Sequence, residues 1–219
     1  LNGSKITWSY LNTSDPNIKY LSLDNKTVSV PNEGLVSLTI KATLTKGDFS
    51  STKEFIIYIG VGTYTGYYQS INGLQGSTLK DELKRIISKM KTISYSNTSY
   101  ILDDSDADPN RKGKVILVYD RSSVSGVWDG GNTWNKEHIW PQSKLGNASK
   151  SDLFNLRPSD PDINQSRQNR PYVAGSGSYG AVGAGWFPGE EDKGDIARAV
   201  FYMNTRWGLA INGQIGDLQ

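Results

Sequence analysis

The sequence predicts an α+β protein with two parts, an all-β segment over residues 1–61 and a mixed helix and strand domain over residues 62–219. Short runs rich in β-branched and aromatic residues fill the first part and alternate with turn-forming residues. Two stretches of the second part repeat apolar residues with helical spacing. A polar motif with the only histidine of the chain lies between those two stretches.

The first part is expected to hold antiparallel strands. The predicted strands are residues 6–10, 19–23, 27–30, 35–44 and 53–59. Turn-forming Asn, Asp, Gly and Pro separate them, and short strands at this spacing are typical of a β-sandwich. The segment LTIKATLTKGDFSSTKEFIIYI also resembles the last strands of bacterial Ig-like surface modules. That resemblance implies an N-terminal Ig-like sandwich that is incomplete.

The second part is expected to contain two helices and a buried strand. Apolar residues recur on one helix face over residues 79–90 and again over residues 196–203. The apolar run 115–119 has the length of a buried strand. A loop rich in glycine and serine, residues 174–185, precedes the last helix.

Charge and cysteine content exclude several classes of protein. The 24 Lys and Arg against 22 Asp and Glu leave a net charge of +2, so binding of a nucleic acid needs a local basic patch. The chain has no cysteine, which excludes disulfides, thiolate metal sites and cysteine nucleophiles. No apolar run approaches the roughly 18 residues of a membrane helix, so no membrane span is expected.

The segment WNKEHIWPQS, residues 134–143, places the single histidine, His138, directly after Glu137. Adjacent residues of a regular strand point to opposite faces, but beside a turn both can border one site. The helical zinc-protease pattern needs a second histidine at position 142, where the chain has Gln142. Ligand count therefore excludes a zinc protease and argues against a conventional structural zinc site. The Glu137 carboxylate suits a hard cation such as Mg²⁺ instead.

A second polar segment, residues 152–170, offers amide oxygens and three arginines. Pro161 is suited to the first turn of a helix. In that helix Asn164, Arg167 and Arg170 share one face, because they are three residues apart. A neutral histidine, a carboxylate, an amide oxygen and guanidinium groups together suit metal-assisted attack on a phosphodiester.

The two segments, WNKEHIWPQS and DLFNLRPSDPDINQSRQNRPY, resemble the bacterial endonuclease I family of secreted and periplasmic nucleases. The resemblance extends over about residues 64–219. It implies the His-Me finger, or ββα-metal, fold for this domain. At position 154 the chain has Phe154 where the family often has histidine, so this position cannot be a ligand.

The resemblance also implies roles for individual residues. His138 is expected to be the general base that activates water, and Glu137 the carboxylate ligand of one divalent cation, Mg²⁺ or alternatively Mn²⁺ or Ca²⁺. The amide ligand of such sites lies in the helix after the hairpin, which favours Asn164 over Asn155. Asn155 is expected to orient the hairpin. Arg167 is expected to complete the catalytic set by holding phosphate.

Three further arginines, Arg157, Arg170 and Arg198, are secondary candidates for phosphate binding. The function implied is a secreted, largely sequence-non-specific endonuclease that cuts DNA, and by extension RNA, to 5′-phosphate and 3′-hydroxyl ends. The alternative is a cell-surface binding module whose nuclease-like domain is catalytically inactive. The sequence makes no prediction of the oligomeric state.

Overall fold

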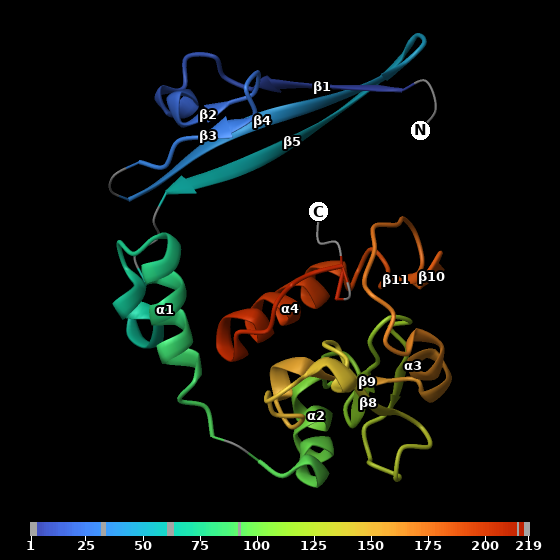
Figure 1. The fold of residues 1–219 in the computed structure, drawn as a ribbon. Coiled ribbons are helices and arrows are strands. Elements are labelled where there is room, and N and C mark those ends of the chain that lie inside the picture. Colours follow the sequence, from blue (N-terminus) through green and yellow to red (C-terminus); the bar gives the residue numbers. More distant parts are fainter. Residues whose placement is uncertain (1–3, 32–33, 61–63, 92, 214, 217–219) are drawn as a thin grey trace. The chain divides into compact units, whose positions relative to one another are not determined.

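A computed structural model describes residues 4–31, 34–60, 64–91, 93–213 and 215–216 of the chain (Figure 1). The chain divides into two compact units, residues 1–82 and 83–219. This division lies inside helix α1 (Gly76–Ile87), further along the chain than the expected boundary after residue 61. None of the described helices is long and apolar enough to cross a bilayer.

The first unit is built on a three-stranded antiparallel sheet. Its strands, in the order β1-β4-β5, are β1 (Lys5–Tyr10), β4 (Leu35–Lys46) and β5 (Phe49–Gly60). A two-residue turn joins β4 to β5, with Lys46 opposite Phe49. Gly47 takes φ 55° at the first position of this turn, where tight hairpins need a positive φ that glycine adopts without strain.

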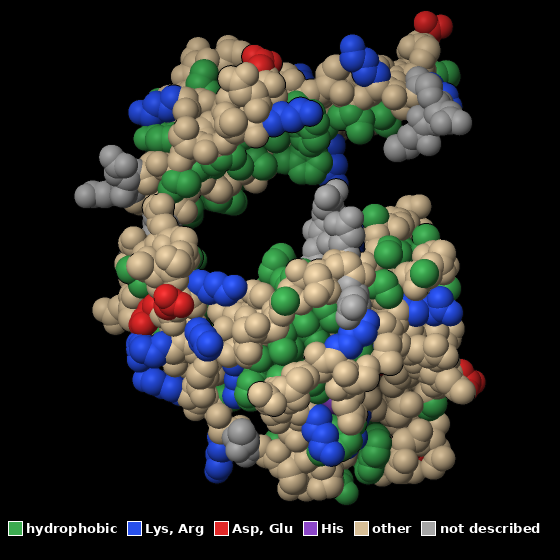
Figure 2. Space-filling model, in the orientation of Figure 1, with side chains coloured by type: hydrophobic (Ala, Val, Ile, Leu, Met, Phe, Trp, Pro, Cys, Tyr) green, Lys and Arg blue, Asp and Glu red, His purple; other side chains and the backbone are tan. Residues whose placement is uncertain are grey.

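A small ribbon covers part of one face of this sheet. It consists of the 3₁₀ helix η1 (Pro16–Tyr20) and the paired strands β2 (Leu21–Ser22) and β3 (Thr27–Val28). Beneath it Leu38, Ile40 and Ile59 form a small buried core. Figure 2 shows apolar side chains gathered along the sheet.

Each of the five predicted strand segments contains a strand, although segments 19–23 and 27–30 retain only two paired residues each. The described part of this unit holds one sheet and one short ribbon rather than two facing sheets. The ribbon pairs only two residues in each strand, which is too few to form a second layer as large as the three-stranded sheet. The Ig-like sandwich therefore stays a prediction.

Four helical elements follow the first sheet along the chain. They are η2 (Gly66–Ile71), α1, η3 (Tyr95–Thr98) and α2 (Ser99–Ser105). Helix α1 begins and ends three residues before the predicted range 79–90. Ile86 is its buried residue.

The centre of the second unit is a pair of antiparallel strands followed by a helix (Figure 1). Strand β8 (Asn135–His138) pairs with β9 (Leu156–Ser159), and α3 (Pro161–Arg167) comes directly after β9. Helix α3 begins at Pro161, as predicted, because the Asp160 carboxylate accepts hydrogen bonds from the first free backbone N–H groups. The strand pair β6 (Lys114–Ile116) and β7 (Ser123–Ser125) lies in the same unit.

The last helix, α4 (Lys193–Trp207), completes the main core of this unit. Its buried face consists of Ile196, Ala199, Val200 and Met203, which confirms the predicted helix face. The remaining short elements are η4 (Gln142–Lys144), η5 (Leu153–Asn155), β10 (Gly180–Val182) and β11 (Gly185–Phe187).

A buried ion pair connects α4 to η5. Arg206 Nη1 lies 3.0 Å from Asp152 Oδ2, and Trp207 Nε1 donates to the same oxygen at 2.7 Å. Asp152 also caps η5 by accepting from the Phe154 N–H. The loop that returns the chain to β9 is thereby attached to α4.

We expect Leu156→Ala to destabilise the second unit. Leu156 is fully buried on β9, so its truncation leaves a cavity that costs about 2–5 kcal/mol. Denaturant unfolding of the full chain should show the loss. Val127→Ala is the control, because Val127 is 72% exposed and its truncation should change the free energy of unfolding by no more than about 0.5 kcal/mol. Equal effects of the two substitutions would contradict this packing.

Candidate active site

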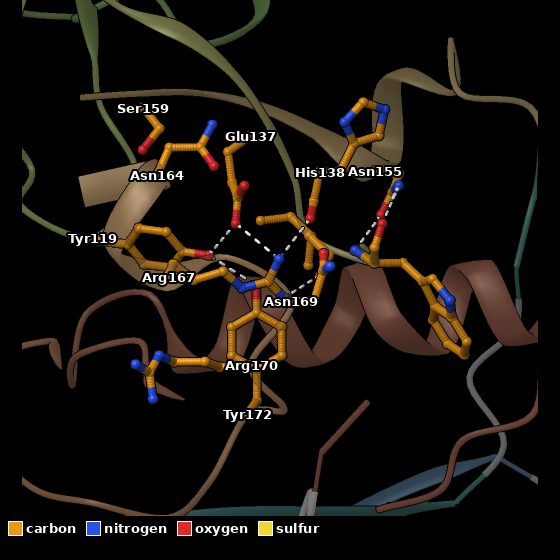
Figure 3. Close-up of polar contacts among 12 residues, drawn as sticks. Tyr119, Glu137, His138, Asn155, Ser159, Asn164, Arg167, Asn169, Arg170 and Tyr172 are labelled. Atoms are coloured by element: carbon orange, nitrogen blue, oxygen red, sulfur yellow. Dashed lines mark hydrogen bonds and ion pairs between the residues drawn. The ribbon is translucent and has the colours of Figure 1, made fainter. Parts of the chain in front are cut away.

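Strands β8 and β9 and helix α3 bring the two polar sequence segments to one pocket of about 260 Å³. Helix α3 packs against β8, so residues of the helix meet the end of the strand (Figure 3). The residues lining the pocket are Tyr95, Lys136, Glu137, His138, Pro141, Gln142, Asn164, Arg167, Gln168 and Asn169.

The His138 imidazole is oriented by one hydrogen bond and one ring contact. Its Nε2 lies 3.0 Å from the Lys150 carbonyl oxygen. A carbonyl oxygen only accepts, so in the neutral ring Nε2 carries the proton and Nδ1 holds the free lone pair. The ring stacks on Tyr95, with centroids 5.7 Å apart and planes 19° from parallel. Burial lowers the pKa of His138, and the nearby positive charges act in the same direction, whereas the hydrogen bond to the Lys150 carbonyl acts against them. The net lowering favours the neutral form that accepts a proton.

The Glu137 carboxylate is buried beside His138 but has different partners. Its Oε1 accepts from the Tyr119 hydroxyl at 2.7 Å and lies 3.2 Å from Arg167 Nη1. Burial raises the pKa of Glu137, whereas the Arg167 charge and the Tyr119 hydrogen bond act in the opposite direction. The ion pair therefore supports the charged carboxylate against its desolvation.

Arg167 is enclosed by protein groups rather than presented to a ligand. Its side chain is 1% exposed, and its Nη1 and Nη2 donate to the carbonyl oxygens of His138 and Ile139 at 3.0 and 2.8 Å. The guanidinium also lies 4.6 Å from the centroid of the Tyr172 ring. Position 167 falls on the side of α3 that packs against β8, so this placement does not suit the expected contact with substrate phosphate. It suits a residue that holds Glu137 and the end of β8.

Asn164 faces the same pocket from α3. Its Nδ2 donates to Asn135 Oδ1 at 2.7 Å, which fixes the orientation of the amide. Figure 3 shows the Asn164 amide oxygen on the side of Glu137. In the described part of the chain no three His, Asp or Glu side chains gather into a metal-ligand group. One carboxylate and one amide oxygen fit Mg²⁺, which keeps several waters and takes further ligands from substrate phosphate.

Asn155 holds the chain where it leaves β8. Its Oδ1 accepts from the Trp140 N–H at 2.6 Å, and its Nδ2 donates to the Trp140 carbonyl at 3.1 Å. The Asn155 backbone carbonyl accepts from the Ile139 N–H at 2.9 Å. Because Asn155 is 1% exposed, its amide contacts the protein alone. This is the geometry of a residue that orients the hairpin.

The structure does not bring the other three candidate arginines into this pocket. Arg157 Nε lies 3.6 Å from Asp106 Oδ1, in a separate pocket. Arg170 Nε donates to the Ser166 carbonyl at 3.4 Å, and Figure 3 shows its guanidinium pointing away from Glu137. Arg198 is exposed on α4 and pairs with Asp195 there. Contact with phosphate at the His138 pocket is therefore unsupported for all three.

Several residues at or behind the pocket were not found from the sequence, and four of them contact the predicted site residues or one another. They are Tyr95, Lys136, Tyr119 and Tyr172. Lys136 lies inside the polar motif and could have been considered there. The tyrosines lie far from the motif in sequence, and an isolated tyrosine gives no signal of which residues it will contact in the folded protein.

Comparison with known proteins places this geometry in a family. The chain matches the Endonuclease I family over residues 75–216, which contain β8, β9 and α3. The chain belongs to the Endonuclease I family. No solved structure matches it.

Two curated relatives of this Endonuclease I chain are both named extracellular ribonuclease. The protein from Bacillus amyloliquefaciens is 36% identical over 171 residues, which cover 73% of the chain and 59% of that relative. The protein from Bacillus subtilis strain 168 is 36% identical over 153 residues, which cover 64% of the chain and 53% of that relative. The matched part of this chain thus spans between one half and three fifths of each relative.

We expect Asn155→Ala to destabilise the Endonuclease I domain. The substitution leaves two buried backbone groups of Trp140 without partners, at a cost of about 1–3 kcal/mol for each. Thermal and denaturant unfolding measure the loss. Asn147→Ala removes the same side chain from an exposed position and should have little effect. A loss no larger than that of the control would show that the amide does not hold this loop.

Proposed function

We propose that this chain is a secreted endonuclease that hydrolyses nucleic-acid phosphodiester bonds with a divalent cation and with little sequence preference. Its support is one observation: a neutral, oriented His138 lies in one pocket with the oxygen donors Glu137 and Asn164. RNA is the first substrate to test, because the two relatives are named extracellular ribonucleases. DNA is the second. The names of these relatives also support secretion.

The arrangement suits hydrolysis by water. His138 Nδ1 takes a proton from water as its oxygen bonds to phosphorus, since Nε2 already donates to Lys150. The bond from phosphorus to the 3′ oxygen breaks, and this oxygen gains a proton from solvent. The products are a 5′-phosphate and a 3′-hydroxyl. When the 2′-hydroxyl of RNA attacks instead, the product is a cyclic phosphate and a 5′-hydroxyl, so the ends distinguish the two routes.

Glu137 and Asn164 are the residues that would hold the cation. When bound, the cation supplies positive charge that stabilises the phosphate oxygens. Arg167 positions Glu137 and two carbonyl oxygens at the end of β8. Asn155 holds the following residues of the loop. We assign Arg167 to positioning in place of phosphate contact, because it is buried among protein groups.

We expect His138→Ala to reduce the rate of cleavage by about 10²–10⁴-fold, the usual contribution of a general base. Initial rates on RNA and on supercoiled plasmid DNA with Mg²⁺ measure it, and circular dichroism checks the fold. Asn97→Ala, an exposed substitution in η3, is the control and should cut normally. Full activity of His138→Ala would eliminate the imidazole as base. Failure of the unmodified protein to cut either substrate would favour the inactive binding module.

We expect Asn164→Ala to weaken binding of Mn²⁺ by at least about tenfold, because it removes one of two protein oxygen donors. Titration calorimetry with Mn²⁺ measures the affinity, and chelation with EDTA should abolish cleavage by the unmodified protein. Asn135→Ala is the matched comparison, since it removes the same Asn164–Asn135 hydrogen bond and leaves the Asn164 oxygen in place. Equal losses from the two substitutions would show that Asn164 acts only through its hydrogen bond.

A further inference from the structure

Lys136 lies at the edge of the His138 pocket in a fixed position. Its Nζ donates to the Tyr95 carbonyl oxygen at 2.8 Å and lies 4.1 Å from the centroid of the Tyr95 ring. The Trp128 ring lies 5.0 Å from the same ammonium group. One hydrogen bond and two aromatic contacts thus hold the ammonium group and leave N–H groups for another acceptor.

Lys136 is partly buried without a carboxylate partner in the described part of the chain. Charged groups that leave water are normally paired, because an unpaired charge loses hydration without compensation. The buried arginines of the same unit follow this rule, since Arg167 pairs with Glu137 and Arg206 with Asp152. The charge of Lys136 is therefore available to an anion.

Lys150 adds a second ammonium group beside the same ring. Its Nζ lies 5.2 Å from the centroid of Tyr95, and its backbone carbonyl is the acceptor for His138 Nε2. Lys150 is exposed, and no carboxylate among the described residues pairs with it. Two positive charges thus lie on the aromatic ring that stacks on the imidazole.

We infer that Lys136 and Lys150, gathered on Tyr95 beside His138, form a subsite that binds a backbone phosphate of the nucleic acid next to the scissile one. The inference rests on the proposed function. The Tyr95 ring already contacts the imidazole and both ammonium groups, so we expect it to position them and not to stack on a base. A contact to phosphate alone carries no sequence information, which fits cleavage with little sequence preference.

The test measures binding in the absence of cleavage. The full chain with His138→Ala is titrated with short fluorescent single strands of DNA and RNA of one sequence, by fluorescence anisotropy. NaCl is varied at fixed divalent-ion concentration. Loss of one phosphate contact to a single strand reduces the steepness of log K against log salt by about 0.7. We expect that reduction from the double variant Lys136→Met with Lys150→Met, and a smaller reduction from each single variant, because both ammonium groups serve one phosphate.

The matched control is Lys112→Met with Lys114→Met, which removes the same charge from exposed positions that do not line the pocket. It should change the slope by much less than the double variant. Lys136→Arg keeps the charge and should retain the slope. Lys150→Met, at an exposed position, tests the subsite even when Lys136→Met disturbs folding.

The two proposals fail in different ways. Failure of the unmodified protein to cut RNA or DNA overturns the proposed function. If the unmodified protein cuts, two results overturn the subsite alone. One is that substitution of the pocket lysines changes the salt slope no more than substitution of the control pair does. The other is that no binding can be measured. A loss of affinity that varies strongly with base sequence also overturns it, because it would indicate contact with bases.

Discussion

The site depends on one buried guanidinium group, that of Arg167. The Arg167 guanidinium joins the last residue of α3 to the end of β8 through the Glu137 carboxylate and the carbonyl oxygens of His138 and Ile139. A charge this deeply buried is tolerated because each of these partners offers a negative or partly negative oxygen. The same contacts determine where Glu137 lies and how the backbone around His138 runs. The geometry of Glu137 and His138 is thus set by an arginine at the inner wall of the pocket whose guanidinium is bound to protein groups.

The neighbouring residues Glu137 and His138 acquire different protonation behaviour from their partners. Burial alone favours the uncharged form of both. His138 has several positive charges near it, which favour its neutral form, whereas Arg167 and the Tyr119 hydroxyl support a charged Glu137. A neutral base thus stands beside a carboxylate that is suited to a cation. Two titratable groups whose surroundings favour different charge states are typical of an acid–base site.

A two-stranded hairpin with a short helix is marginal by itself, so its surroundings must stabilise it. Asn155 binds both backbone groups of Trp140 and closes the long connection from β8 to β9. Asp152, paired with Arg206, attaches the same connection to α4. Lys150, whose backbone carbonyl accepts the hydrogen bond from His138, lies on this connection. These polar contacts therefore support the Endonuclease I site in addition to those of Arg167.

Local sequence by itself determined the start of α3. Asp160 caps the helix, and Pro161 has the backbone angle φ that the first turn of a helix requires. It also determined the buried face of α4 and the adjacency of Glu137 and His138. Only the tertiary structure decided which charges meet. Helix α3 ends at Arg167, so Arg170 lies beyond the helix and not on the expected shared face with Asn164 and Arg167. Arg167 is buried against β8, and Tyr95 accepts a hydrogen bond from Lys136 across 41 positions of the chain. Helix caps and apolar periodicity act between residues that are close in the sequence. The partner of a charged or aromatic side chain is instead set by packing between segments that are far apart in the sequence.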